Sequence, residues 1–130
     1  MKRYFIPCML CLFFACSEPV IRNDADIWFD EQEHDFGLLT CKKAVECRLN
    51  FSNPGKKTVL VISNVKTSCG CTVAEWTKTP VKPGKSGMID IRYDAASVGV
   101  FRKEVKVYYN GPGSPAVLKI KGEVKSAVKP

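Results

Sequence analysis

The chain has 130 residues, a formal net charge of +7, seven cysteines and 45% hydrophobic residues. A chain of this length builds one hydrophobic core, which excludes two separately folded domains of ordinary size. The charged fraction of 25% is typical of globular proteins, so the composition also excludes wholesale disorder and a polytopic membrane protein. An odd number of cysteines requires an explanation before disulfides are considered.

The N-terminal segment has the pattern of an export signal. Two basic residues precede an uncharged apolar run, residues 5–15, which is too short for a membrane-spanning helix of about 20 residues. The run ends in Leu-Phe-Phe-Ala-Cys-Ser, which resembles a bacterial lipobox, in which the cysteine is lipidated and becomes the mature N-terminus. We expect residues 1–15 to be a lipoprotein-type signal peptide and Cys16 the lipidation site. The alternative is ordinary signal cleavage after Ser17.

The residues that follow the signal predict a location and a tether. Ser17, rather than an aspartate, follows the lipidation cysteine, which resembles lipoproteins that are released to the outer membrane. We therefore expect anchorage in the outer membrane of the cell envelope, facing the periplasm or the cell surface. Residues 16–25 show no apolar periodicity and are expected to form an acidic tether.

The charge is divided unevenly along the chain. Residues 17–35 carry a net charge of −6, whereas residues 36–130 carry +11. Because the bases are spread along the sequence rather than clustered, we expect them on solvent-facing sides of strands, where lysines hinder edge pairing. A surface for anionic lipid head groups or acidic polymers is the alternative.

The cysteines fall into three groups. Two leave with the signal peptide, and Cys16 carries the lipid. Four remain in the domain: Cys41, Cys47, Cys69 and Cys71. An even number of cysteines in an exported chain suggests disulfides, and three connectivities are open.

Short alternating runs of apolar and polar residues continue to the end of the chain, separated by turn residues and with no helical period. Strands are expected at residues 26–30, 34–39, 45–51, 59–65, 71–73, 88–93, 101–109 and 118–124. Seven or eight short strands at this spacing predict an all-β fold over residues 26–126, an immunoglobulin-like antiparallel β-sandwich of two sheets.

The same alternation predicts which side chains face the core. His34, Phe36 and Leu38 are expected on one face of their strand. Residues 59–65 are more continuously apolar than the other runs, as expected for a strand that is covered on both sides.

The most distinctive local sequence is Ser-Cys-Gly-Cys-Thr at residues 68–72. The Cα atoms of Cys69 and Cys71 would lie about 7 Å apart in an extended strand, at the limit of bridging, so a disulfide between them would be strained and reducible. Three interpretations stay open. In the first, the pair is structural. In the second, the pair takes part in disulfide exchange, and Lys66 is the one nearby base that would lower the pKa of a thiol. In the third, the pair joins Cys41 and Cys47 in a metal site.

The other two cysteines of the domain bracket a turn. Cys41 and Cys47 are separated by five residues, Lys-Lys-Ala-Val-Glu. A disulfide between them would close a small loop and contribute about 2.4 kcal/mol to stability in the chain-entropy model. We treat these two residues as a candidate local disulfide.

Recognisable catalytic arrangements are missing from the sequence. The single histidine, His34, alternates with Phe36 and is expected to pack or to cap rather than to act as a base. Trp28 and Trp76 are expected to fill the core, as large aromatic residues of sandwiches usually do. We therefore expect no enzyme, no cofactor and no resident metal, and export disfavours nucleic acid as a partner.

Several short motifs occur in a fixed order along the chain. They are Asp35-Phe36-Gly37, Leu49-Asn50-Phe51-Ser52-Asn53-Pro54-Gly55, Leu60-Val61-Ile62-Ser63-Asn64-Val65, Ser68-Cys69-Gly70-Cys71-Thr72, Pro83-Gly84 and Ile91-Arg92-Tyr93-Asp94. The series resembles the bacterial family known as domain of unknown function 1573, found in exported and often lipid-anchored proteins of Bacteroidetes-type bacteria. The resemblance covers about residues 26–124. It implies an immunoglobulin-like sandwich and supplies no activity.

Taken together, the sequence predicts a membrane-anchored exported lipoprotein that acts as a non-catalytic binding or assembly module of the cell envelope. The expected partners are the membrane, through the lipid, and an envelope protein or polymer that adds a strand to a sheet edge or contacts the loops. The domain itself is expected to be monomeric or weakly associated. The alternative is a thiol-redox or metal-handling protein that acts through Cys69 and Cys71.

Overall fold

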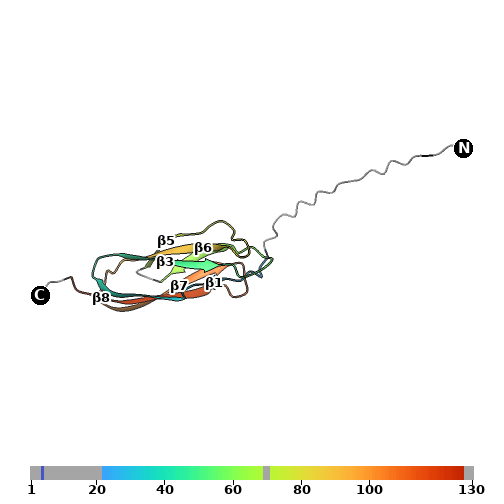
Figure 1. Ribbon diagram of the computed structural model, residues 1–130. Helices are drawn as coiled ribbons and strands as arrows, with labels where there is room; N and C mark the ends of the chain where they lie inside the picture. The colour runs from blue at the N-terminus through green and yellow to red at the C-terminus, as the bar shows by residue number, and fades with distance from the viewer. Residues whose placement is uncertain (1–3, 5–21, 69–70, 128–130) are drawn as a thin grey trace.

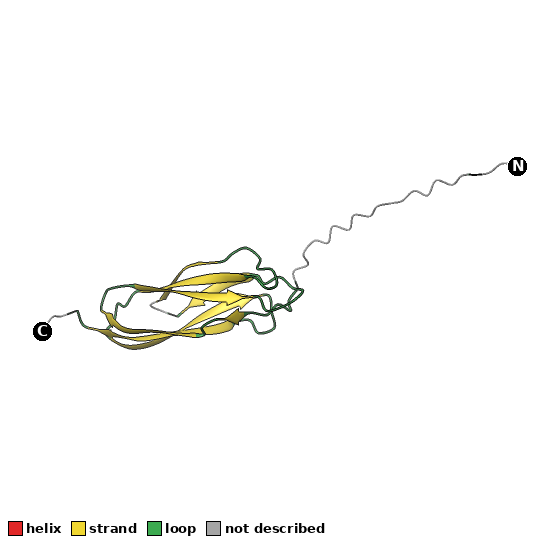
Figure 2. Ribbon diagram, in the orientation of Figure 1, coloured by secondary structure: helices red, strands yellow, loops and turns green. Residues whose placement is uncertain are grey.

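A computed structural model of the chain describes residues 4, 22–68 and 71–127. Within these residues all regular structure is β-strand, and no helix is present that could cross a membrane. Two four-stranded sheets lie face to face, the first in the order β1-β3-β6-β5 and the second in the order β2-β8-β7-β4 (Figures 1 and 2). The strands are β1 (Trp28–Phe29), β2 (Glu33–Thr40), β3 (Val45–Ser52), β4 (Ile62–Thr67), β5 (Cys71–Trp76), β6 (Ser86–Tyr93), β7 (Gly99–Tyr109) and β8 (Ala116–Lys125).

The structure confirms the all-β sandwich that the alternation predicts. It differs in one strand pair, because β2 and β8 run parallel while the other five pairs are antiparallel. Short turns force neighbouring strands to run antiparallel, but β2 and β8 are separated by nearly the whole domain sequence. No local connection therefore dictates how they are oriented.

Alternating side chains of the central strands form the core between the sheets. Leu49 and Ile91 point inward from the first sheet, and Val105 and Ile120 point inward from the second; all four are fully buried. Each such side chain contributes about 1.5–3 kcal/mol when it leaves water. The inward positions of β3, β6, β7 and β8 are those that the sequence predicts.

The predicted face of β2 is wrong for one residue. Leu38 is 67% exposed, whereas Leu39, expected outside, is partly buried against the core. A β-bulge between Asp35 and Leu38 shifts the register against β8, and Gly37 adopts a φ of 71° within it. An inserted residue reverses the alternation beyond it, which places Leu38 outward.

The strand expected at residues 59–65 is also different in the structure. Leu60 forms only an isolated bridge to Val81, and β4 begins at Ile62. β4 is an edge strand whose Ser63 and Asn64 are exposed, so it is not covered on both sides. The apolar run arises because Leu60 and Ile62 both reach the core from a segment that changes from loop to strand.

The first strand is shorter than predicted and leaves its tryptophan outside. Trp28 pairs with Ser52 and is 62% exposed, while Phe29 is buried beside the ring of Phe51. The expectation that Trp28 fills the core is therefore wrong. Trp76 is partly buried against the core, and the Nζ atom of Lys78 lies 4.9 Å from the centroid of its ring.

The sandwich has two ends with different loops. The β2–β3, β4–β5 and β6–β7 connections share one end, because Tyr93 pairs with both Val45 and Cys71. We call this the cysteine end. The β3–β4, β5–β6 and β7–β8 connections lie at the other end, where Ala25 donates its backbone N–H to the carbonyl of Asn110 at 2.9 Å. We call this the N-terminal end, since residues 22–27 join the sandwich there (Figure 1).

Candidate functional site

The structure brings three of the predicted cysteines to the cysteine end. Cys41 follows β2, Cys47 is an inward residue of β3, and Cys71 is the first residue of β5. All three are partly buried and pack against the core. Cys16 and Cys69 lie outside the described residues.

The three described cysteines carry free thiols. The candidate disulfide between Cys41 and Cys47 is therefore not formed, and the thiol of Cys41 instead donates to the carbonyl of Ala96 at 3.6 Å. Cys47 and Cys71 lie on β3 and β5, which flank β6. Two strand spacings amount to about 9.6 Å, beyond the reach of a disulfide, so these two thiols cannot bridge without a large movement.

The environment of the thiols keeps them protonated. Burial, followed by the charges of Glu31 and Asp90, raises the pKa of Cys47 to about 11. Burial likewise raises the pKa of Cys71 to about 11, although Lys103 acts in the opposite direction. Since the thiolate is the nucleophile in disulfide exchange, both residues are weak nucleophiles at neutral pH.

The base beside Cys71 is not the one that the sequence suggested. Lys66 points outward, and its Nζ atom lies 5.5 Å from the centroid of the Tyr108 ring. Lys103 instead occupies an inward position of β7, opposite Ile120, and it is the base whose charge acts on Cys71. Within the described residues, no group of three or more His, Cys, Asp or Glu side chains is placed to hold a metal ion.

The Asp-Phe-Gly motif builds the bulge of β2 rather than a reactive site. Asp35 accepts a hydrogen bond from the backbone N–H of Gly37 at 2.8 Å, which stabilises the positive φ of that glycine. Phe36 packs against the core, with its ring centroid 4.7 Å from that of His34. His34 therefore packs as the sequence predicts, and its Nδ1 atom also lies 3.2 Å from the carboxylate of Glu31, a contact that was not predicted.

The Asn-Pro-Gly motif has a structural role at the N-terminal end. Asn53 is 1% exposed, and its side-chain amide donates to the carbonyls of Thr58 and Val81 at 2.8 and 2.9 Å. Its side-chain oxygen accepts the N–H of Gly55 at 2.9 Å. The backbone carbonyl of Asn53 also accepts the N–H of Gly84, so two of the motifs meet around one buried amide.

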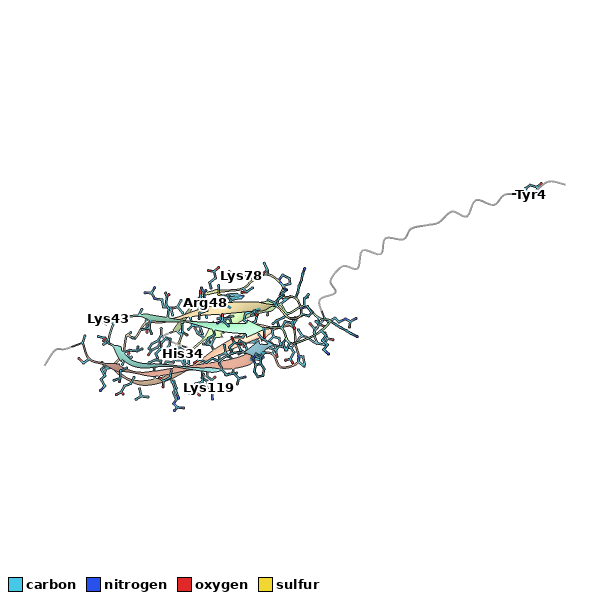
Figure 3. The ribbon with its side chains drawn as sticks, in the orientation of Figure 1. Tyr4, His34, Lys43, Arg48, Lys78 and Lys119 are labelled. Atoms are coloured by element: carbon cyan, nitrogen blue, oxygen red, sulfur yellow. The ribbon has the colours of Figure 1, made fainter. Side chains whose placement is uncertain are left out.

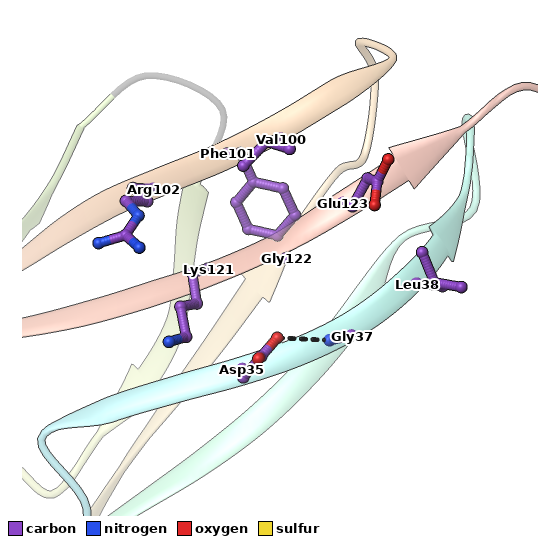
Figure 4. A pocket seen from close by; sticks show the side chains of 9 residues that line it. All are labelled: Asp35, Gly37, Leu38, Val100, Phe101, Arg102, Lys121, Gly122 and Glu123. Atoms are coloured by element: carbon purple, nitrogen blue, oxygen red, sulfur yellow. Dashed lines mark hydrogen bonds between the residues drawn. The ribbon is translucent and has the colours of Figure 1, made fainter.

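A shallow hollow of about 340 Å³ lies on the outer side of the second sheet, over β2, β7 and β8 (Figure 4). Its polar lining includes Asp35, Arg102 and Lys121. Arg102 and Lys121 face each other directly across the β7–β8 pair, an arrangement of like charges that costs stability. The Nζ atom of Lys121 lies 3.1 Å from the carboxylate of Glu33.

Exposed apolar side chains adjoin this hollow toward the cysteine end. Val100 is 76% exposed, Leu38 67% and Val98 61%. Val100 and Leu38 both pair with Glu123, from opposite sides of β8. We call Leu38, Val98 and Val100 the apolar patch. A group of exposed apolar side chains beside charged residues is typical of a protein interaction site.

Sequence reasoning did not identify the apolar patch, although part of its signal was present. In an alternating strand, Val98 and Val100 would fall on the same face as Arg102 and Glu104. The polar face of β7 is therefore continued in the sequence by apolar residues. Leu38 carried no such signal, because its outward position depends on the bulge at Gly37. The two valines of the patch could therefore be identified from the alternation in the sequence, whereas the exposure of Leu38 depends on how β2 pairs with β8.

Several solved structures share this fold at low sequence identity. A protein of unknown function from Porphyromonas gingivalis W83 has a TM-score of 0.67 and 20% identity over 85% of this chain and 51% of its own. The PapD-like domain 7 of human CEP192 has a TM-score of 0.63 and 10% identity over 85% of this chain and 94% of its own. The VesB protease of Vibrio cholerae has a TM-score of 0.62 and 15% identity over 78% of this chain and 32% of its own.

These similarities establish the fold alone. The chain spans about half the length of the Porphyromonas protein, 51%, and about a third of the Vibrio protease, 32%. No curated protein matches the chain. The family model described as protein of unknown function, DUF1573, matches residues 27–124, nearly the whole sandwich, and the chain therefore belongs to this family.

Proposed function

We propose that the protein is a non-catalytic binding or assembly module of the cell envelope, anchored to the outer membrane by a lipid on Cys16. The anchor is supported by the cysteine directly after the apolar leader. The binding role is supported by the apolar patch beside a charged hollow. The partner is an envelope protein or polymer.

The apolar patch is the observation that carries the binding role. Three aliphatic side chains remain in water at one end of the second sheet, although Val105 and Val107 of β7 are fully buried. Covering exposed apolar surface contributes about 25 cal/mol for each Å² removed from water. A partner that covers Leu38, Val98 and Val100 gains this free energy, and Arg102 and Lys121 favour a partner with a carboxylate or phosphate nearby.

The sheet edges do not favour the addition of a partner strand. β1 covers only the last two residues of β3, and the stretch of β3 that stays open carries the exposed charges of Glu46 and Arg48. Each of the other three edge strands carries a register shift, between Asp35 and Leu38, Ile62 and Asn64, and Val73 and Glu75. Bulges twist an edge and interrupt its row of hydrogen-bonding groups. We therefore propose contact through the face of the second sheet, in place of an added strand.

The thiol-redox alternative receives less support. Of the two cysteines of this alternative, Cys71 is a neutral thiol at neutral pH, and Cys69 lies outside the described residues. Disulfide exchange requires an accessible thiolate. A binding module is the function that the described residues support best.

Site-specific photo-crosslinking in intact cells tests the binding role. A photoreactive amino acid at Val100 is expected to give one discrete adduct, which Leu38→Ser weakens severalfold by removing part of the same patch. Val117 is the matched control, since it is exposed on the same sheet but at the N-terminal end. Equal labelling from both positions, or no discrete adduct from Val100, would contradict the proposal.

A further inference from the structure

Six exposed bases gather at the N-terminal end of the sandwich, although they are far apart in the sequence. They are Arg22, Lys56, Lys57, Lys78, Lys82 and Lys85. We call them the basic end. Among the described residues, none of the six forms an ion pair.

The topology explains why these bases meet. Lys56 and Lys57 lie in the β3–β4 connection, while the other three lysines lie in the β5–β6 connection. The two connections are held side by side, because Leu60 and Val81 exchange both of their backbone hydrogen bonds at 2.9 and 2.8 Å. Arg22 is attached to the same end through its carbonyl, which accepts the side-chain N–H of Asn110 at 2.8 Å.

The acids at this end do not neutralise the bases. Segments 22–27, 53–61, 77–85 and 110–115 contain six bases and two acids, a net charge of +4. Both acids have local partners. Asp24 accepts a hydrogen bond from the hydroxyl of Thr58 at 2.8 Å, and Asp26 accepts the N–H of Ile27 at 2.8 Å. At the cysteine end, residues 41–44 and 94–98 carry two lysines and one aspartate, a net charge of +1.

An exposed aromatic residue stands beside the basic end. Trp28 pairs with Ser52, the last residue of β3, so it lies next to the β3–β4 connection, and it is 62% exposed. Tryptophan is enriched at membrane–water interfaces, where its ring and its N–H are both accommodated. Basic loops with a neighbouring exposed tryptophan are typical of a surface that rests on lipid head groups.

The proposed anchor lies within reach of this end. The chain from Cys16 to Arg22 spans at most about 21 Å when fully extended. The electrostatic potential of a charged membrane is screened over a Debye length of about 8 Å at physiological ionic strength. Because the tether is longer than this distance, the bases can either touch the membrane or stay beyond the reach of its potential. Charge on the membrane surface then decides which of these occurs.

We propose that the basic end docks on anionic lipid head groups of the membrane that holds the lipid anchor. This inference rests on the proposed lipidation of Cys16. The lipid holds the chain at the membrane, and each lysine near an anionic surface then favours the docked orientation by about fivefold. Docking fixes the sandwich with its N-terminal end at the membrane.

Lysine footprinting tests the docking on the mature protein, purified from membranes and reconstituted into vesicles. Vesicles of neutral lipid are compared with vesicles that contain about a third anionic lipid, and an amine-reactive ester is read out by peptide mass spectrometry. We expect Lys56, Lys57, Lys82 and Lys85 to be labelled at least about fivefold more slowly in anionic vesicles, and high salt to abolish the difference. The controls within the same molecule are the exposed Lys42, Lys43 and Lys125, which lie at the cysteine end.

Equal rates for the two sets of lysines in anionic vesicles would overturn the inference. Matched variants separate charge from folding. In a Trp76→Phe background, replacing Lys56, Lys57 and Lys82 by glutamine is expected to remove a blue shift of Trp28 emission on anionic vesicles, whereas replacing the three control lysines, with the same change in net charge, retains it. If mass spectrometry finds no lipid on Cys16, the anchor proposal fails on its own. The docking is then decided by salt-dependent pelleting of the same chain with anionic vesicles, and its absence overturns the inference as well.

Discussion

Two asparagine side chains organise the N-terminal end at the scale of single residues. Asn53 joins the β3–β4 connection to Val81, while Asn110 accepts the N–H of Val61 and donates to the carbonyl of Val59. A buried backbone group that loses its hydrogen-bond partner lowers the free energy of unfolding by about 1–3 kcal/mol. One side-chain amide that serves several such groups therefore contributes more to stability than a single hydrogen bond does. These contacts hold together the loops that carry the basic end.

Asn53→Ala is expected to lower the free energy of unfolding by about 3 kcal/mol, because it leaves the carbonyls of Thr58 and Val81 without their side-chain donor. Urea denaturation measures the change. Asn50→Ala is the control, since Asn50 is exposed on the same strand and should change stability by less than about 0.5 kcal/mol. Similar losses for both variants would show that the buried amide has no special role.

The thiols give a second prediction at this scale. With pKa values of about 11, Cys47 and Cys71 should react with iodoacetamide far more slowly at pH 8 than glutathione does, and their rates should rise up to about pH 11. Peptide mass spectrometry measures each rate. Fast alkylation of Cys71 at pH 7 would instead favour the thiol-redox alternative.

The same raised pKa values affect stability. Unfolding returns each thiol to its ordinary pKa of 9.0, so the unfolded chain releases protons first as the pH rises. The contribution of the buried thiols is complete below pH 9 and is lost between about pH 9 and 11. A variant with serine at both positions should show a smaller fall in unfolding free energy over this interval, and an unchanged fall would contradict the assignment.

At the scale of elements, the bulge of β2 depends on two glycines that lie against each other. Gly37 has a φ of 71° with open space around it, whereas a Cβ on Gly122 would lie 2.8 Å from the Phe101 ring and 3.0 Å from the carbonyl oxygen of Gly37. The bulge exposes Leu38, and the close approach at Gly122 lets Phe101 stack on Tyr93 with centroids 4.0 Å apart.

These environments predict different costs for adding one methyl group. Gly37→Ala should destabilise the protein by about 1 kcal/mol, through backbone strain alone. Gly122→Ala should cost about 2–3 kcal/mol, because the aromatic ring or the bulge must move. Thermal or urea unfolding of both variants provides the comparison, and the reverse order would show that the bulge is not held as described.

Sequence patterns predicted the individual strands better than the way in which the strands pair and are ordered in the sheets. Alternation placed Leu49, Ile91 and Val105 in the core, because each depends only on its own strand. The parallel pairing of β2 with β8 and the outward turn of Leu38 depend on contacts between distant segments, which alternation does not report. The position of Cys47 across β6 from Cys71 is likewise a property of strand order.

At the scale of the whole molecule, the two ends of the sandwich have different chemistry. The basic end and residues 22–27 lie together, while the apolar patch lies near the cysteine end. β7 has 11 residues and spans about 35 Å, so docking at one end would hold the patch about this far from the membrane. Lys43 and Lys119, which are not part of the basic end, are exposed elsewhere on the sandwich (Figure 3).

The interrupted edges predict that the domain does not associate through its sheets. Three edge strands carry a register shift, and the stretch of β3 that the short β1 leaves open carries the exposed charges of Glu46 and Arg48, so continuous edge-to-edge pairing is hindered. Sedimentation velocity of the delipidated protein should therefore give a monomer across the micromolar range. A stable dimer that persists after Val100→Ser but dissociates on proline substitution in an edge strand would contradict this.

The central claim, that the chain is a membrane-anchored envelope module, is tested most directly at its N-terminus. Intact-mass and peptide mass spectrometry of the protein purified from the producing cell's membranes would identify the first residue and its modification. The account predicts a chain that begins at Cys16 and carries a covalent lipid. An unmodified chain that begins at Glu18 would contradict it.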